Sequence, residues 1–410
     1  MRLRFRLKAI PAIIYTALLV LVCISGPFHE APSDVKPLIG PAPAAEVTLS
    51  CGTYPVETTE LTAVIQSEDI SKLDSLSYLT RADFSGSSCW KEIAEWGQAH
   101  PLLELKYTVT LPDGTVLDNS AAELDLSSLG HAAAAETAEA LSCLPAVTHI
   151  NLGAQSAGSD ALTLADIGAI HEACPNAELD YSLTLYGHEI NLSASSLDFR
   201  GTQISDEAAA LAEVLPLMMR CTYLDMDNTG VSNEALAKIR EQFPNIDVVW
   251  RVWFGTNYSV RTDTERILAS KPTVGGMIYD ASVLQYCTKV KYLDLGHNDE
   301  LPSIDFVRNM PELEVLIIAM TAVRDISPLE SCPKLEYLEL NSTNIADISP
   351  LKNSTGLHHL NIAGCPNIKD ISPLYGLTEL ERLWIGCDTP VPDKQVSAMK
   401  AAVPGCTINT

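Results

Sequence analysis

The chain has 410 residues, of which 47% are apolar, so it can bury a large core and is not a disordered polypeptide. Asp and Glu number 52 against 27 Lys and Arg, which gives a formal net charge of −25. A field of that sign repels a phosphate backbone, and nucleic acid is therefore excluded as a predicted partner.

Residues 1–26 have the composition of a signal peptide or signal anchor. Four basic residues precede an apolar run at Ala12–Ile24, which is shorter than the roughly 20 residues that span a bilayer. If this segment stays uncleaved, it holds the chain at a membrane. Residues 27–45 contain five prolines and predict a stiff, extended tether. We therefore expect the rest of the chain to lie outside the cytoplasm, secreted or anchored at the cell surface.

Residues 46–289 are predicted to form irregular repeats. Short apolar-x-apolar triplets recur at spacings that reach 26 to 27 residues, and each has the alternation of a half-buried strand. The spacing leaves room for helices, such as one that follows Ser232, because a cap residue is followed there by an early acid and later bases. The triplets begin at Ala82, Leu124, Ile150, Leu197 and Leu224.

A longer pattern lies on top of these triplets. Three segments place an aromatic residue six positions after a proline, with apolar residues that alternate around a Gly turn. This alternation predicts a β-hairpin in each segment. The pairs are Pro101/Tyr107, Pro175/Tyr181 and Pro244/Trp250, and a similar segment begins at Val47.

Residues 290–410 carry a regular repeat of 22 to 23 residues. The pentapeptide DISPL occurs at Asp325–Leu329, Asp347–Leu351 and Asp370–Leu374. Each unit opens with apolar residues at its first, fourth and sixth positions and has Asn, Thr, Cys or Asp at its ninth. Because several positions recur in register, the units match the leucine-rich repeat. We expect the array to end in a capping helix.

The DISPL segment has a structural interpretation. Ile348 and Leu351 are expected to point into the core, with Ser349 capping a short helical turn and Pro350 at its first position. The segment is then the return bend of a solenoid coil. The predicted fold is an α/β solenoid: a leucine-rich-repeat array with a parallel concave sheet, short 3-10 or α-helical convex segments and inserted β-hairpins.

The DISPL coils resemble those of internalin-type bacterial surface proteins, from Val290 to about Asp388; from Leu79 to Met226 the resemblance is to leucine-rich repeats in general. It implies a curved solenoid that binds a partner, usually a protein, on its concave sheet. The sequence lacks the internalin-type helical cap, the Ig-like domain and the wall-sorting tail, so host-cell invasion does not carry over.

The outward positions of the strands are the candidate binding surface. Asp recurs in one outward column, where it either keeps an exposed strand soluble or binds cations. Aromatic rings gather in the later coils, and such rings are enriched at binding surfaces, although Tyr is also a common strand residue. The predicted ligand-binding residues are Tyr223, Asp225, Tyr292, Asp294, Tyr337, Glu339, His359, Asn361, Arg382 and Trp384.

No motif for a nucleophile, a phosphate loop or a zinc site is present, so we expect no enzymatic activity, no cofactor and no metal. Many cysteines close a repeat beside a proline, which predicts buried, unpaired thiols. A carboxylate pair for glycoside hydrolysis would need more burial than an open sheet provides. The leading hypothesis is a protein or peptide ligand. A glycan- or cell-wall-binding module and a spacer are the alternatives, and the oligomeric state stays open.

Overall fold

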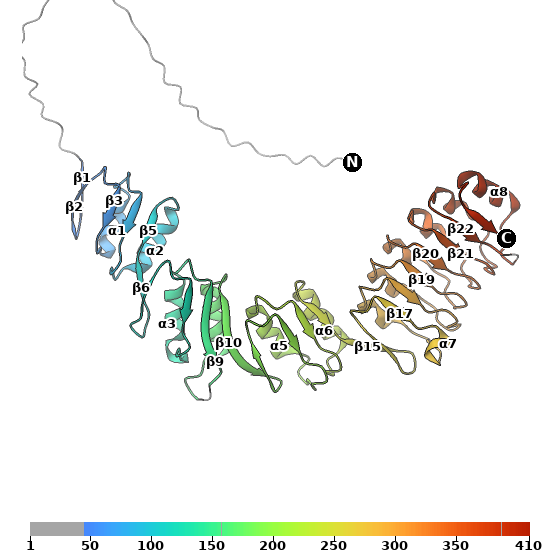
Figure 1. The fold of residues 1–410 in the computed structure, drawn as a ribbon, viewed down its shortest axis with the longest axis horizontal. Helices are drawn as coiled ribbons and strands as arrows, with labels where there is room; N and C mark the ends of the chain where they lie inside the picture. The colour runs from blue at the N-terminus through green and yellow to red at the C-terminus, as the bar shows by residue number, and fades with distance from the viewer. Residues whose placement is uncertain (1–44, 157, 387) are drawn as a thin grey trace, which may run out of the picture.

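The computed structural model describes residues 45–410 except residues 157 and 387. The predicted export segment, 1–26, and nearly all of the predicted tether, 27–45, lie outside the described residues. The described chain forms an arc of stacked coils with its first strands at one end and its last helix at the other (Figure 1). It divides into four blocks, each built on its own parallel sheet.

An antiparallel hairpin and the first block begin the array. The hairpin is the one expected from Val47, and the block is a three-stranded parallel sheet followed by a second hairpin. The hairpin strands are β1 (Glu46–Leu49) and β2 (Gly52–Pro55); the block contains β3 (Glu60–Thr62), α1 (Ser67–Leu73), β4 (Arg81–Asp83), α2 (Trp90–Ala99), β5 (Glu104–Lys106), β6 (Thr108–Thr110) and β7 (Val116–Asp118).

The second and third blocks repeat this plan. In each, three parallel strands are followed by an antiparallel hairpin. The second contains β8 (Glu123–Asp125), α3 (His131–Leu141), β9 (His149–Ala154), α4 (Leu164–Ala173), β10 (Glu178–Leu185) and β11 (His188–Asn191). The third contains β12 (Ser196–Asp198), α5 (Ala209–Val214), η1 (Leu215–Leu217), β13 (Tyr223–Asp225), α6 (Asn233–Gln242), β14 (Asp247–Val249), β15 (Arg251–Phe254) and β16 (Tyr258–Arg261).

The fourth block is a seven-stranded parallel sheet that starts at Arg266, ahead of the predicted start of the regular repeats at 290. Its strands are β17 (Arg266–Leu268), β18 (Tyr292–Asp294), β19 (Val315–Ile317), β20 (Tyr337–Glu339), β21 (His359–Asn361), β22 (Arg382–Trp384) and β23 (Thr407–Asn409). Its helical segments are α7 (Lys271–Val274), η2 (Ser282–Tyr286), η3 (Asp305–Asn309), η4 (Ser327–Ser331), η5 (Ser349–Asn353), η6 (Ser372–Gly376) and α8 (Asp393–Ala402). The array was expected to end in a capping helix, but β23 follows α8 and pairs with β22.

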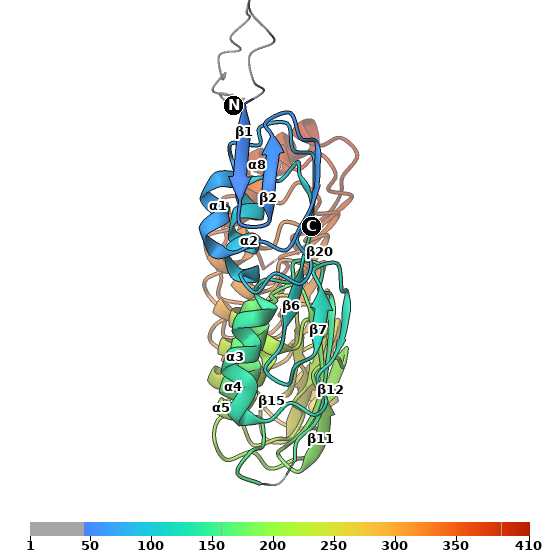
Figure 2. The same cartoon turned by 90° about the vertical axis from the view of Figure 1, so that its left-hand side faces the viewer.

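Helices and strands occupy opposite sides of the coils. Helices α1 to α5 lie along one side, and strands such as β7 and β12 lie along the other (Figure 2). The core between them is continuous, because the parallel strands send aliphatic side chains inward and most of these are buried. Polar residues at the ninth repeat position are also buried: Thr321 Oγ1 donates to the Ile318 carbonyl at 2.8 Å, and Asn298 Nδ2 donates to the Leu295 carbonyl at 2.8 Å. They satisfy backbone groups that the turn leaves unpaired.

The DISPL segments form the return bends, as predicted, but the expected cap residue was wrong. In the second copy the Asp347 carboxylate accepts hydrogen bonds from the Ser349 N–H at 2.8 Å and from the Ser349 hydroxyl at 2.9 Å. Ile348, Pro350 and Leu351 are buried. Asp347 therefore closes the turn, because its carboxylate lies two residues ahead of the N–H that needs an acceptor, and Ser349 is the donor.

The aromatic residues of the proline–aromatic pairs are buried where a sheet gives way to its hairpin. Tyr107, Tyr181 and Trp250 are each at most 3% exposed. Tyr107 donates to the Cys143 carbonyl at 2.6 Å, and Trp250 Nε1 donates to Asn233 Oδ1 at 2.9 Å. Each ring thus fills the space that opens between a hairpin and the coils around it.

Candidate functional site: the outward face of the seven-stranded sheet

The outward side chains of β17 to β23 form one rigid surface, called here the sheet face. Strand pairing is in register throughout, so these side chains lie in two straight columns. The first column is Arg266, Tyr292, Val315, Tyr337, His359, Arg382 and Thr407. The second column is Leu268, Asp294, Ile317, Glu339, Asn361, Trp384 and Asn409. Eight of the ten predicted binding residues are thereby brought together.

Two ring contacts hold the first column in place. The Arg266 guanidinium lies over the Tyr292 ring, 4.3 Å from its centroid. Further along, the Tyr337 ring stacks on the His359 imidazole with centroids 4.2 Å apart and planes 6° apart. The tyrosine rings are therefore oriented by their strand neighbours.

The polar groups around this stack are also fixed. The Tyr337 hydroxyl bonds to the Glu339 carboxylate, and burial followed by this bond raises the pKa of Tyr337 to about 12. Burial lowers the pKa of His359, the charge of Arg382 lowers it further, and the charge of Glu339 opposes them. His359 Nε2 is buried and has no hydrogen-bond partner in the described part of the chain. The column thus presents a neutral imidazole between tyrosine and arginine.

Trp384 is the large apolar group of the second column that projects furthest into solvent, with 44% of its surface exposed. Register places it directly between Asn361 and Asn409 on the neighbouring strands. Leu268, at the other end of the column, is 37% exposed. The column therefore combines exposed apolar groups with amide and carboxylate groups.

Tyr223 and Asp225 lie elsewhere. They belong to β13 in the three-stranded sheet of the third block, which is separate from the seven-stranded sheet. Asp225 is only 4% exposed, and its carboxylate is occupied. Arg261, at the end of the hairpin strand β16, donates to Asp225 Oδ2 at 3.1 Å and to the Tyr223 hydroxyl at 3.0 Å. The expected outward presentation of Asp225 is thus replaced by an internal ion pair.

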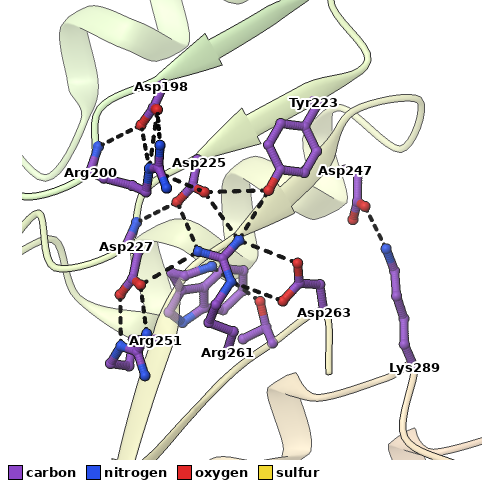
Figure 3. A network of polar contacts seen from close by, with 12 residues as sticks. Asp198, Arg200, Tyr223, Asp225, Asp227, Asp247, Arg251, Arg261, Asp263 and Lys289 are labelled. Carbon is purple, nitrogen blue, oxygen red and sulfur yellow. Dashed lines mark hydrogen bonds and ion pairs between the residues drawn. The ribbon is translucent and has the colours of Figure 1, made fainter. Parts of the chain in front are cut away.

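Asp225 and Arg261 belong to a larger ion cluster (Figure 3). Arg251 on β15 donates two hydrogen bonds to Asp227, at 3.0 and 2.9 Å, and Arg261 also contacts Asp263 at 3.2 Å. Burial lowers the pKa of Arg261, but the bonds and charges of Asp263 and Asp225 outweigh it and raise that pKa overall. The cluster fastens the hairpin of β15 and β16 to β13.

Sequence reasoning missed the basic half of this cluster. Arg251 and Arg261 are directly opposite each other in the hairpin. Alternate residues of a strand share a face, so the pattern R-x-W after Trp250 already placed Arg251 and Trp253 on one side. What the sequence could not supply was the fit of the hairpin against β13.

The described residues hold neither a metal-binding cluster nor a membrane-spanning helix. Among residues 45–410, without 157 and 387, no group of three or more His, Cys, Asp and Glu is arranged to hold a metal ion. Within the same residues, no helix has the length and apolar character needed to cross a membrane.

The one-strand coils, the parallel sheet and the return bends define a leucine-rich-repeat solenoid. A family model described as Leucine Rich repeats (2 copies) matches residues 311–353, within the DISPL coils. The described chain thus has the leucine-rich-repeat fold that its repeat pattern predicts. No curated protein matches it.

Solved structures with a similar fold include those of two bacterial leucine-rich-repeat proteins. An internalin (InlF) of Listeria monocytogenes has 15% identity and a TM-score of 0.30, over 87% of this chain and 82% of that chain. A leucine-rich-repeat protein of Leptospira interrogans has 15% identity and a TM-score of 0.34, over 83% of this chain and 92% of that chain.

Proposed function

We propose that the chain is an exported, non-enzymatic binding protein that holds a protein or peptide partner on the sheet face. The observation that carries this proposal is the exposed Trp384 in the second column, beside the first column that holds the ordered rings of Tyr292, Tyr337 and His359. Aromatic side chains are enriched among the residues that contribute most to protein interfaces. The acidic and amide groups beside them supply the hydrogen bonds that fix a partner's orientation.

Preorganisation supports this use of the surface. Tyr292 and Tyr337 are already held by Arg266, His359 and Glu339, so a partner does not have to order them. Each rotamer-rich side chain that is immobilised on binding costs about 0.5–1.5 kcal/mol, and that cost is reduced here. A repeat array also holds its outward columns rigid over several strands.

A glycan or cell-wall polymer is the second candidate. Trp384 lies between Asn361 and Asn409, which places hydrogen-bonding amides on both sides of an exposed indole. A ring-shaped, hydroxyl-rich ligand can stack on the indole and bond to the amides.

The test uses the full chain against two probe sets, a displayed peptide library and a glycan array. We expect peptide binders, and we expect Trp384→Ala to weaken them at least tenfold, while Trp253→Ala, at an exposed tryptophan of the β15 hairpin, leaves them unchanged. Binding to glycans alone would favour the second candidate. Binders that tolerate Trp384→Ala and the double substitution Tyr292→Ala with Tyr337→Ala would contradict the placement on the sheet face.

A further inference from the structure

A polar cavity of about 330 Å³ lies where the third block meets the seven-stranded sheet. Helix α6, strand β14, the segment after β16 and the segment after η2 all contribute to its walls. It is separate from the sheet face and from the repeat positions discussed above. Its charged lining residues are Arg240, Asp247, Asp263 and Lys289.

Both acids of this cavity are neutralised by other groups. Asp247 is paired with the Lys289 ammonium, and Asp263 accepts from Arg261 Nε at 3.2 Å (Figure 3). The remaining charge in the lining is the guanidinium of Arg240. Of the four charged lining residues, Arg240 is thus the one without an ion-pair partner among the residues that the structure describes.

Arg240 is held in place by neutral groups. Its guanidinium lies over the Trp250 ring, 4.8 Å from the centroid, and Nη1 donates to the Tyr286 carbonyl at 2.8 Å. It makes no ion pair with the residues that the structure describes. The side chain is half-buried, and burial lowers the pKa of the guanidinium. A buried charge without a counter-ion is unfavourable, so a bound anion at this place would be stabilised.

The first block has a neutral residue at the position that Arg240 occupies in the third. Counting four residues back from the proline after the helix gives Arg240 in α6 and Gly97 in α2. A cavity of about 400 Å³ beside Gly97 has no lysine or arginine in its lining. A cavity is therefore present beside the helix in both the first and the third block, and only the cavity of the third block has an arginine in its lining.

We propose that the Arg240 cavity binds an oxyanion, the carboxylate or phosphate group of a small ligand. A guanidinium presents several N–H donors in a planar fork that matches such groups. The hydroxyl of Thr288 and the amide of Asn245, which also line the cavity, supply neutral hydrogen bonds beside it. Lys289 remains paired with Asp247 and so keeps that carboxylate neutralised beside the anion.

Isothermal titration of the full chain with inorganic phosphate and with acetate, each against chloride at equal ionic strength, tests the proposal. We expect saturable binding of at least one anion. Arg240→Gln should weaken it about tenfold or more, because a charge-assisted bond is lost. Arg324→Gln, the same change at an exposed position, should leave it unchanged. Asp247→Asn should strengthen it, because one acid leaves the cavity and Lys289 becomes available.

The anion preference assigns the ligand class: tighter phosphate binding indicates a phosphate group, and tighter acetate binding a carboxylate. Absence of saturable binding for both anions overturns the proposal, as does equal binding by the parent and Arg240→Gln. If Arg240→Gln does not fold, Asp247→Asn decides: tighter binding supports the site, and unchanged or weaker binding overturns it. Binding of peptides to the sheet face should be unaffected by either variant, so the two proposals fail separately.

Discussion

The Tyr337 ring lies flat against the His359 imidazole, with their planes only 6° apart. The two residues are direct partners on β20 and β21, so the stack follows from strand pairing. Because the Tyr337 hydroxyl is also bonded to Glu339, both ends of the tyrosine are held. This makes Tyr337 a part of the surface that is in position before any partner arrives.

We expect the double substitution Tyr292→Ala with Tyr337→Ala to weaken binding of a selected partner by about 2 kcal/mol or more, because two ordered rings leave the interface. Surface plasmon resonance with immobilised partner measures this. The control, Asp83→Ala with Asp125→Ala, removes two outward acids of the first and second blocks and should have little effect. Equal affinities for the tyrosine variant and the parent would place the partner elsewhere on the solenoid.

Replacing Arg261 should destabilise the junction between the third block and its hairpin. Arg261→Met leaves Asp225, whose side chain is 6% exposed, without its closest cation. Removing one partner of a buried pair costs about 3 kcal/mol. Urea unfolding, monitored by circular dichroism, measures the loss of unfolding free energy. The matched control is Arg81→Met, whose pairs with Glu60 and Glu104 are largely exposed and therefore contribute little to stability. If both variants lose a similar amount of unfolding free energy, the buried pair contributes no more to stability than an exposed pair does.

The cysteines should react according to burial. All nine described cysteines are free; Cys51 is exposed, whereas burial raises the pKa of Cys287 to about 12 and that of Cys332 to about 11. Thiolates are the reactive form, so native alkylation at pH 8 should label Cys51 first and leave both buried thiols intact. In denaturant without reductant, mass spectrometry should find most cysteines labelled. Recovery of four or five disulfides would contradict this prediction.

Acid should loosen the first hairpin through Asp69. Burial raises the pKa of this carboxyl, but hydrogen bonds from Ser50, Gln66 and Lys72 outweigh it and lower that pKa from 3.8 to about 2. A depressed folded pKa stabilises the fold above 3.8, and this contribution is lost as the pH falls from 3.8 toward 2. It amounts to about 2 kcal/mol at neutral pH.

Asp69→Asn should therefore increase hydrogen exchange in β1 and β2 at pH 7, while the difference from the parent shrinks below pH 3.8. The substitution Asp113→Asn, in the exposed turn of the β6–β7 hairpin, is the control. A difference between Asp69→Asn and the parent that does not change with pH would exclude this linkage.

The coils were predictable because their signal is periodic. Leu316, Leu338 and Leu360 recur at the repeat spacing and are all fully buried partners in one ladder. The hairpins were predictable for a similar reason, since alternation around a glycine is a local pattern. The sequence did not predict that Met320 and Ser342 adopt left-handed backbone angles, with φ of 55° and 58°. Residues other than glycine rarely adopt a positive φ, so we attribute this conformation to the stacking of the coils.

The candidate site was also predictable only in part. The columns on the sheet face follow from strand alternation, and the structure places eight predicted residues in them. The role of Asp225 depended on Arg261, 36 positions away and on another element. A hairpin's register is local, but its packing against a neighbouring strand is not, and that packing decided which carboxylates remain free for a ligand.

The hairpins also divide the array mechanically. Among the described residues, no strand of one block pairs with a strand of the next, so the backbone ladder is interrupted at each hairpin. In an uninterrupted solenoid, the fraying of one coil exposes the edge of its neighbour, and the loss spreads along the array. Here fraying stops at a hairpin, where buried aromatic rings and ion pairs replace the ladder. Pulled from its ends, the chain should give way in separate steps, and the seven-stranded sheet can stay whole after an earlier block has opened.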